Sequence, residues 1–333
     1  MRLTPSSSRL VLLGLLSASA PALAASDVCY QGGPTLANFK LNDGASLAGS
    51  SIVITPNSGG KRGAAMYQSK FSSANDFHIE TKVKISLGSL IPADGMAFVM
   101  HNDPAGADAI GTAGFGIGYD GIASSLAVEF DTFQNGNDPA GSHIALTKDG
   151  VADHGDPANS GFPVVEFSSL GSPFEPTDGT PFFIWIDFTA TSKKLDVFVS
   201  QGETKPASAA LTATVDLGAT LGSTFYVGFT GSTGGYWNLH EFLELYVTDH
   251  AASARAACCA SHADCAGSSF GAVCDPIKRV CGACTIDDAS ACGGNKGCKI
   301  DGPHNACMDP CDGNHGGGGL AACSSPAFPV CRT

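Results

Sequence analysis

Short apolar runs separated by Gly, Pro, Asn and Asp fill the chain from about residue 28 to residue 247. Residues 77–85 (FHIETKVKI) alternate apolar and polar side chains, with the period of a strand that exposes one face to water. Further runs of strand length occupy residues 95–101, 125–131, 181–189, 195–200, 224–231 and 242–248. After the first 24 residues, no stretch has the periodicity of a helix.

Many short strands without helices predict an all-β fold, an antiparallel β-sandwich of about 220 residues. Its core is expected to include these apolar side chains: Phe98, Val128, Phe183, Trp185, Val197 and Val227. We interpret the aromatic residues in this set as packing residues and not as functional ones.

The first 24 residues have the pattern of a secretory signal peptide. Arg2 and Arg9 accompany an apolar run at residues 10–16, and small residues at 22–24 (ALA) mark a cleavage site. The apolar run is too short to span a bilayer, and no later segment is long and apolar enough to do so. The sequence therefore predicts a secreted chain, extracellular or periplasmic, without a membrane span.

Cysteine is confined to two places in the sequence. One residue is Cys29, and the other 12 of the 13 cysteines lie between Cys258 and Cys331. In an exported chain, such a cluster predicts disulfides that stabilise a segment with few core-forming residues. Cys281 and Cys284 have a spacing that also suits zinc, but the many neighbouring cysteines favour disulfides. The odd total leaves at least one thiol without a partner in the chain.

These patterns divide the chain into a signal peptide at 1–24, a β-sandwich at 25–249, an Ala-rich linker at 250–257 and a Cys-rich segment at 258–333. The net charge of −13 and the absence of a basic stripe exclude nucleic acids and anionic membranes as expected partners.

The strongest candidate chemistry lies at residues 129–143 (EFDTFQNGNDPAGSH). Five side chains here can bind a metal: Glu129, Asp131, Asn135, Asp138 and His143. Strand alternation places the first two on one face, and the Asn-Gly pair that follows turns the chain, so that the last two can fold back toward that face. Carboxylate and amide oxygens suit Ca²⁺, whereas carboxylates with an imidazole suit a transition ion such as Mn²⁺. A solvated strand that ends in a hairpin turn has the same pattern, so spacing alone leaves both interpretations open.

Residues 126–144 resemble the metal-binding signature of the L-type, or legume-type, lectins. For the transition ion, the resemblance implies these ligands: Glu129, Asp131, Asp138 and His143. For Ca²⁺, it implies the same two aspartates, the amide oxygen of Asn135 and the backbone carbonyl of Phe133.

The resemblance extends over about residues 28–248 and implies a sugar site beside the metals. Residues 93–98 (ADGMAF) are similar to a motif in which Asp94 follows a cis peptide bond and accepts hydrogen bonds from sugar hydroxyls. Residues 111–116 (GTAGFG) resemble a loop that gives a backbone N–H to the sugar, and the ring of Phe133 would stack on its apolar face. The full implied sugar-binding set is Asp94, Gly114, Phe133, Asn135, Gly234 and Gly235. A plain turn at Asp94, which precedes a glycine, is the alternative.

The family resemblance implies a concanavalin-like jelly roll that binds glycans and can form a homodimer. The short loop at residues 234–239 favours mannose or glucose over galactose. Residues 265–281 are similar to Cys-rich repeats of secreted myxobacterial proteins.

Two other functions are compatible with a sandwich of this kind. One is a glycoside hydrolase of the laminarinase-like family, whose strand motif is Glu-x-Asp-x-x-Glu. The third acidic position is Gln134 here, and an amide cannot supply the proton that a retaining mechanism needs. The other is an exported structural or adhesive protein with a degenerate site, which the complete set of candidate ligands disfavours. We therefore expect a lectin and not an enzyme.

Overall fold

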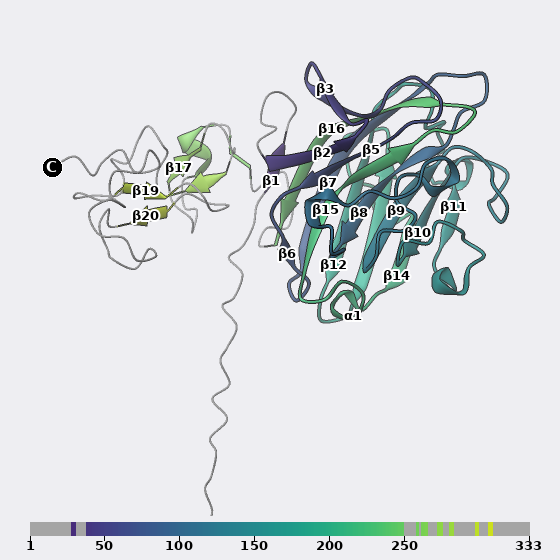
Figure 1. Cartoon of the computed structure of the whole chain (residues 1–333). Helices are drawn as coiled ribbons and strands as arrows, with labels where there is room; N and C mark the ends of the chain where they lie inside the picture. The colour runs from purple at the N-terminus through teal and green to yellow at the C-terminus, as the bar shows by residue number, and fades with distance from the viewer. Residues whose placement is uncertain are drawn as a thin grey trace, which may run out of the picture.

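A computed structural model describes residues 28–30, 38–249, 258–259, 261–265, 272–275, 280–282, 297–299 and 306–308. The predicted signal peptide at 1–24 and linker at 250–257 lie outside these residues, and the division into domains stays a prediction. The strands form two antiparallel sheets that pack face to face, as Figure 1 shows. The predicted all-β sandwich is confirmed.

The first sheet contains eight strands. In spatial order they are β14 (Leu211–Thr214), β13 (Lys194–Ser200), β12 (Phe182–Thr189), β7 (Phe77–Leu87), β16 (Asn238–Thr248), β4 (Ser51–Thr55) and β3 (Ser46–Ala48), with β1 (Val28–Tyr30) also paired to β16. The long strands β7 and β16 pair along almost their whole length and form the centre of this sheet.

The second sheet also contains eight strands, and the candidate metal and sugar residues lie on its strands or in the loops next to them. In order they are β11 (Val164–Glu166), β10 (His143–Lys148), β9 (Ser125–Asp131), β8 (Gly95–His101), β15 (Thr224–Ser232), β5 (Arg62–Tyr67) and β2 (Phe39–Asp43), with β6 (Phe71–Ser72) paired to β15. Every residue of β8 and β9 is buried, because both faces of the sheet are covered at its centre.

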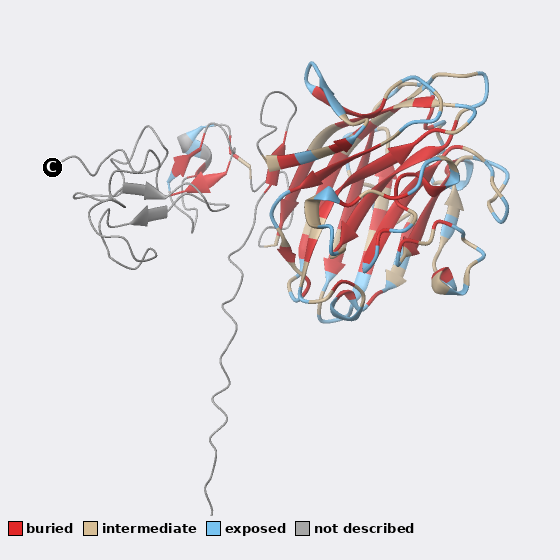
Figure 2. Cartoon of the chain, viewed as in Figure 1, coloured by how far each residue is buried: buried red, intermediate tan, exposed pale blue. Residues whose placement is uncertain are grey.

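The main core fills the space between the sheets, and Figure 2 shows buried residues running through the strands of both. Phe98, Val128, Val197 and Val227 belong to it, as predicted. A second apolar cluster covers the outer face of the second sheet, where Ile117, Tyr119 and Ile122 of a loop pack on Val99 and other small residues of the strands. This cluster anchors the loop that contains the candidate residue Gly114.

Phe183 and Trp185 are buried, as predicted, at 3% and 6% exposure, but on the face of β12 opposite the main core. On β12 the alternate residues Phe182, Ile184 and Ile186 face the core instead. Phe183 and Trp185 stack on each other, with ring centroids 5.8 Å apart, and the ammonium of Lys82 lies 4.9 Å from the Phe183 ring. Apolar residues occupy both faces of this strand, so the sequence pattern did not reveal which face points inward.

Helical structure in the sandwich is brief. The α-helix α1 (Leu217–Leu221) has five residues, and Asp216 caps it by accepting a hydrogen bond from the Ala219 N–H at 3.0 Å. Short 3₁₀ turns include η3 (Gly114–Gly116) and η4 (Pro157–Asn159). One helical turn is too short to show periodicity, which is why the sequence did not predict α1. Among the described residues, no helix has both the length and the apolar character needed to cross a membrane.

The described residues of the Cys-rich segment take part in three disulfides: Cys29–Cys258, Cys259–Cys274 and Cys265–Cys281. The first attaches this segment to β1 of the sandwich. Strands β17 (Val273–Cys274) and β18 (Cys281–Gly282) form a small hairpin in which the backbone of Cys274 lies opposite that of Cys281. A second hairpin consists of β19 (Gly297–Lys299) and β20 (Ala306–Met308). The preference for disulfides over zinc is confirmed at Cys281.

Candidate functional site

The candidate residues meet at one edge of the second sheet, where four neighbouring strands begin or end. His143 at the start of β10 lies opposite Asp131 at the end of β9. Asp131 lies opposite Gly95 at the start of β8, and Gly95 lies opposite Ser232 at the end of β15. Antiparallel pairing thus brings the predicted metal and sugar motifs side by side, although they are far apart in the sequence.

Backbone donors orient two of the candidate metal ligands. The Phe133 N–H donates to Oδ1 of Asp131 at 2.7 Å, and the Asn135 N–H donates to Oδ2 of Asp138 at 2.7 Å. The turn after β9 therefore folds back so that Asp138 approaches Asp131, as the sequence predicted. Glu129 on β9 and His143 on β10 are buried nearby, at 0% and 1% exposure.

Within the described residues, no lysine or arginine compensates the charge of the acidic cluster. Oε1 of Glu129 accepts a hydrogen bond from the Thr147 hydroxyl at 3.0 Å, but its buried Oε2 has no hydrogen-bond partner. Burial raises the pKa of Glu129 and that of Asp131 well above the ordinary carboxyl value, and the neighbouring Asp138 raises both further. No lysine or arginine forms an ion pair with these carboxylates in the part of the chain that the structure describes.

This donor set fits a bound cation. A buried, unpartnered carboxylate oxygen among like charges is costly unless a positive charge approaches it. Carboxylates and an imidazole are ligands that divalent cations use in proteins. The residues that would hold such an ion are those predicted from the sequence: Glu129, Asp131, Asn135, Asp138 and His143.

One further imidazole, that of His154, belongs to the cluster and was missed by the sequence analysis. Its Nε2 lies 2.8 Å from Nε2 of His143, 3.5 Å from Oδ1 of Asp138 and 3.7 Å from Oε2 of Glu129. His154 comes from the loop that follows β10, so strand periodicity gave no indication of its position. The available signal was a second histidine close in sequence to the acidic motif.

Asp94 occupies a separate part of the same edge. The Ala93–Asp94 peptide bond is cis, as the resemblance implied. The side chain of Asp94 is almost fully buried, Oδ2 has no hydrogen-bond partner, and burial raises the pKa of this carboxyl to about 6. A Cβ atom built on Gly234 would lie 3.1 Å from that Oδ2. The structure therefore brings Asp94 and Gly234 together, as predicted, and leaves a carboxylate oxygen available beside the glycine backbone.

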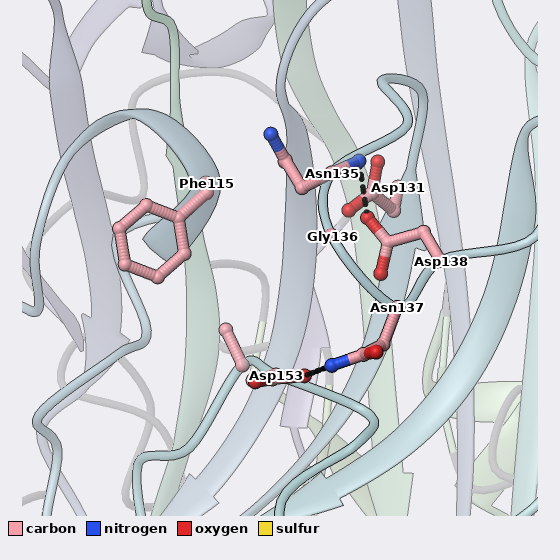
Figure 3. A pocket seen from close by; sticks show the side chains of 8 residues that line it. Phe115, Asp131, Asn135, Gly136, Asn137, Asp138 and Asp153 are labelled. Carbon is pink, nitrogen blue, oxygen red and sulfur yellow. Dashed lines mark hydrogen bonds between the residues drawn. The ribbon is translucent and has the colours of Figure 1, made fainter.

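A pocket of about 290 Å³ opens between the acidic cluster and the Gly-rich loop. Its lining consists of Phe115, Asp131, Asn135, Gly136, Asn137, Asp138, Ala152 and Asp153. Figure 3 shows Phe115 on one side of this pocket and Asn135 and Asp138 on the other. Phe115 is 54% exposed and was not predicted as a site residue, although an apolar side chain in a Gly-rich loop was the signal for it.

The other sugar-site candidates, Gly114, Phe133 and Gly235, do not line this pocket. The Ser232 hydroxyl donates to the Gly114 carbonyl at 2.7 Å, which ties the Gly-rich loop to β15. Phe133 pairs with the exposed Tyr236, with ring centroids 6.0 Å apart. Gly235 is exposed and has open space where a side chain would be.

Comparisons with known proteins agree with this fold. A family model described as the legume lectin beta-barrel domain matches residues 34–244. A probable L-type lectin-domain containing receptor kinase S.7 of Arabidopsis thaliana is 32% identical over 162 residues, which cover 44% of this chain and 22% of the kinase. Agglutinin-2 of Cladrastis kentukea is 31% identical over 133 residues, which cover 39% of this chain and 41% of the agglutinin. The chain thus spans less than half the length of these relatives.

Solved structures show the same fold. The lectin from Bauhinia forficata in complex with GalNAc is 19% identical, with a TM-score of 0.55 over 68% of this chain and 98% of that chain. The winged bean acidic lectin complexed with methyl-α-D-galactose is 21% identical, with a TM-score of 0.55 over 67% of this chain and 98% of the lectin. Together with the match of the family model over most of its length, this shows that the chain belongs to the legume lectin β-barrel domain family.

Proposed function

We propose that this protein is a secreted lectin that binds glycans at the edge of the second sheet through a site organised by Ca²⁺ and a transition ion such as Mn²⁺. The observation that carries the proposal is the Asp94 carboxylate, which is buried, has an unpartnered oxygen, and lies beside the backbone of Gly234. A buried acceptor without a partner is costly, and a sugar hydroxyl would supply the missing donor.

Backbone and side-chain groups around Asp94 would complete the sugar site. The backbone N–H groups near Gly114 and Gly235 and the amide of Asn135 can donate to hydroxyl oxygens. The ring of Phe133 offers an apolar surface for the face of a pyranose. These assignments follow the sequence prediction and are supported by the proximity of the β8, β9 and β15 ends.

The metal site would act on sugar binding through the fold of the loop. Ca²⁺, held by Asp131, Asp138, Asn135 and the Phe133 carbonyl, would supply the positive charge that the acidic cluster lacks. The turn after β9 would then keep Asn135 and Phe133 in position for the sugar. A chelator should therefore abolish sugar binding even though the metal need not touch the sugar.

A hydrolase function is not favoured. Gln134 stands where the laminarinase-like motif has its second glutamate, and its side chain is exposed. Carboxylates of the cluster lie beside the imidazole of His154, and this arrangement has no role in a retaining glycosidase mechanism. The plant receptor kinases resemble this chain over only 22% and 29% of their lengths, so their kinase activity is not transferred to it.

The preferred monosaccharide is proposed from the loop between β15 and β16. This loop is short, which favours mannose or glucose, whereas the two solved lectins named above were bound to GalNAc and to methyl-α-D-galactose. Export is supported by the signal-peptide pattern and by the disulfide between Cys29 and Cys258, since disulfides persist in oxidising compartments.

The test is a glycan array probed with the purified chain in Ca²⁺ and Mn²⁺, and repeated after EDTA treatment. Binding to a coherent set of glycans that EDTA removes and Ca²⁺ restores is the expected result. Competition by methyl-mannoside against methyl-galactoside then decides the monosaccharide. A folded, metal-loaded chain that binds no glycan on the array would refute the lectin proposal.

A further inference from the structure

His154 is a second imidazole in the acidic cluster, which neither the sequence motif nor the family resemblance supplies. Its Nε2 lies close to ligand atoms of two predicted ligands, 2.8 Å from Nε2 of His143 and 3.5 Å from Oδ1 of Asp138. One ligand atom of each of these three residues lies within 4.8 Å of the others. The unpartnered Oε2 of the buried Glu129 is 3.7 Å from the same nitrogen.

These separations match ligands around one ion. Metal–nitrogen bonds of about 2.0–2.1 Å place adjacent ligand atoms about 2.9 Å apart in an octahedral site and about 3.4 Å apart in a tetrahedral site. The distances of 2.8, 3.5 and 3.7 Å from His154 Nε2 fall around these values. His154 is therefore placed as a neighbour of each of the other three ligands and does not lie behind them.

The loop that carries His154 is fixed by hydrogen bonds on both sides. The buried Asn159 donates to the carbonyls of Val151 and Asp153 at 2.8 and 3.0 Å, and its Oδ1 accepts from the Lys148 N–H at 2.9 Å. From the turn after β9, Asn137 donates to Oδ1 of Asp153 at 2.9 Å. The side chain of His154 is only 6% exposed. Its position beside the cluster is thus built into the fold.

A hydrogen bond between two neutral imidazoles would also explain the contact of His143 with His154. It would, however, leave Oε2 of Glu129 without a partner and the neighbouring carboxylates without a positive charge. A divalent ion among the four residues satisfies both rings and that oxygen together.

We infer that His154 binds the transition ion directly through Nε2, so that this site has two imidazole ligands, His143 and His154, beside the carboxylates Glu129, Asp131 and Asp138. The inference rests on the proposed metal dependence but not on sugar binding. Imidazole suits Zn²⁺, Cu²⁺ and Ni²⁺ better than Mn²⁺, which prefers carboxylates and water. The second imidazole therefore shifts the selectivity of the site from Mn²⁺ toward Zn²⁺.

The test titrates Zn²⁺ and Mn²⁺ into the untagged full-length chain with Ca²⁺ held at saturation, in wild type and in His154→Gln. Loss of a residue that merely supports a ligand costs about 10–100-fold in affinity, so loss of a direct ligand should lower Zn²⁺ affinity by at least about tenfold. Mn²⁺ affinity should fall by a smaller factor. His78→Gln, which alters a histidine on the other sheet that pairs with Asp187, is the matched control and should change neither affinity.

Electron paramagnetic resonance of the chain with one equivalent of Cu²⁺ counts the bound nitrogens directly. Wild type and His78→Gln should show two coupled imidazole nitrogens, and His154→Gln and His143→Gln should each show one. A single nitrogen in wild type overturns the inference, and this reading does not depend on any variant folding. An unchanged ratio of Zn²⁺ to Mn²⁺ affinity in folded His154→Gln also overturns it. Because no sugar is present, failure of glycan binding on the array leaves these outcomes unaffected.

Discussion

Thr132 holds the backbone carbonyl of Asp94 with two hydrogen bonds, from its N–H at 2.9 Å and from its hydroxyl at 3.1 Å. Thr132 directly follows Asp131, so the strand that carries the candidate metal ligands also positions the candidate sugar acceptor. The Asp94 N–H donates in turn to the Ser232 carbonyl of β15 at 3.1 Å. Asp94 is thus fixed between β9 and β15, and a disturbance of the acidic cluster can reach it through a single residue, Thr132.

Asp94→Asn should abolish glycan binding while leaving metal binding intact. The amide keeps the shape of the side chain but replaces one of the two acceptor oxygens with an NH₂ group, which can only donate. Glycan affinity should fall by at least about a hundredfold, which corresponds to about 2.7 kcal/mol. Isothermal titration with the best glycan checks this, and the thermal shift produced by Ca²⁺ should match wild type. Asp108→Asn, at an exposed ion pair with Lys40, is the control, and equal affinities in the two variants would contradict the assignment.

Gly234→Ala should weaken glycan binding, and Gly235→Ala should have little effect. The new Cβ at residue 234 would stand 3.1 Å from Oδ2 of Asp94 and occupy the space in front of that oxygen, whereas residue 235 has nothing within 4 Å. Neither glycine has a backbone conformation restricted to glycine, so both variants should fold. Surface plasmon resonance on a glycan-coated chip compares them. A larger loss at residue 235 than at residue 234 would be inconsistent with the site.

Asp131→Asn should abolish the difference in stability between metal-loaded and chelated protein. An ion that binds only the folded chain stabilises it by about 2.7 kcal/mol at a concentration a hundredfold above Kd. Wild type should therefore melt at a higher temperature in Ca²⁺ and Mn²⁺ than in EDTA, and the variant should show no such shift. In EDTA the variant should be at least as stable as wild type, because it removes one charge from a buried acidic cluster while keeping an acceptor for the Phe133 N–H. Differential scanning calorimetry measures all four states, and an EDTA-insensitive wild type would rule out a metal that stabilises the fold.

His240 should make the fold less stable in mild acid. It is fully buried and contacts the Thr55 hydroxyl, and burial lowers the pKa of its imidazole to about 3. Below pH about 6.5, the ordinary pKa of histidine, His240 is protonated in the unfolded chain but stays neutral in the folded chain. The unfolding free energy therefore falls by about 1.4 kcal/mol per pH unit. The loss ends as the pH falls through the folded-state pKa.

His240→Asn keeps a partner for Thr55 and removes the titrating group. Between pH 7 and pH 5, the difference in unfolding free energy between wild type and this variant should change by about 2 kcal/mol in favour of the variant. Urea denaturation in EDTA at both values checks this, since the chelator removes any metal contribution. A difference that does not depend on pH would show that His240 is protonated in the folded chain.

The sequence predicted the strands with sharp boundaries best. The ranges 95–101 and 125–131 coincide with β8 and β9. Asp94 marks the start of the first apolar run, and the polar turn after Asp131 marks the end of the second. The sequence did not predict β10 (His143–Lys148). Its apolar run is short and lies between polar residues, so its strand character comes from pairing with β9. The burial of both faces of β12 likewise hid the inward face from a pattern of period two.

The proximity of the candidate ligands on β9 and the turn after it could be predicted from sequence, because local geometry determines where these side chains point. His154 and Phe115 could not. His154 reaches Glu129 only because β10 folds back on β9 and the Asn159 contacts then bend the next loop inward. Phe115 borders the pocket because the 3₁₀ turn η3 is held to β15 through Ser232. Both positions depend on tertiary pairing that no local pattern contains.

The Cys29–Cys258 disulfide has a mechanical consequence. The chain leaves the sandwich at Thr248 of β16, and β1, which carries Cys29, is hydrogen-bonded to that same strand. A pulling force applied to the chain beyond Cys258 therefore enters the sandwich at two adjacent strands, through the polypeptide at Thr248 and through the sulfur bridge at Cys29. The load is shared by strands that lie side by side, so tension on the tail does not peel β1 away from β16.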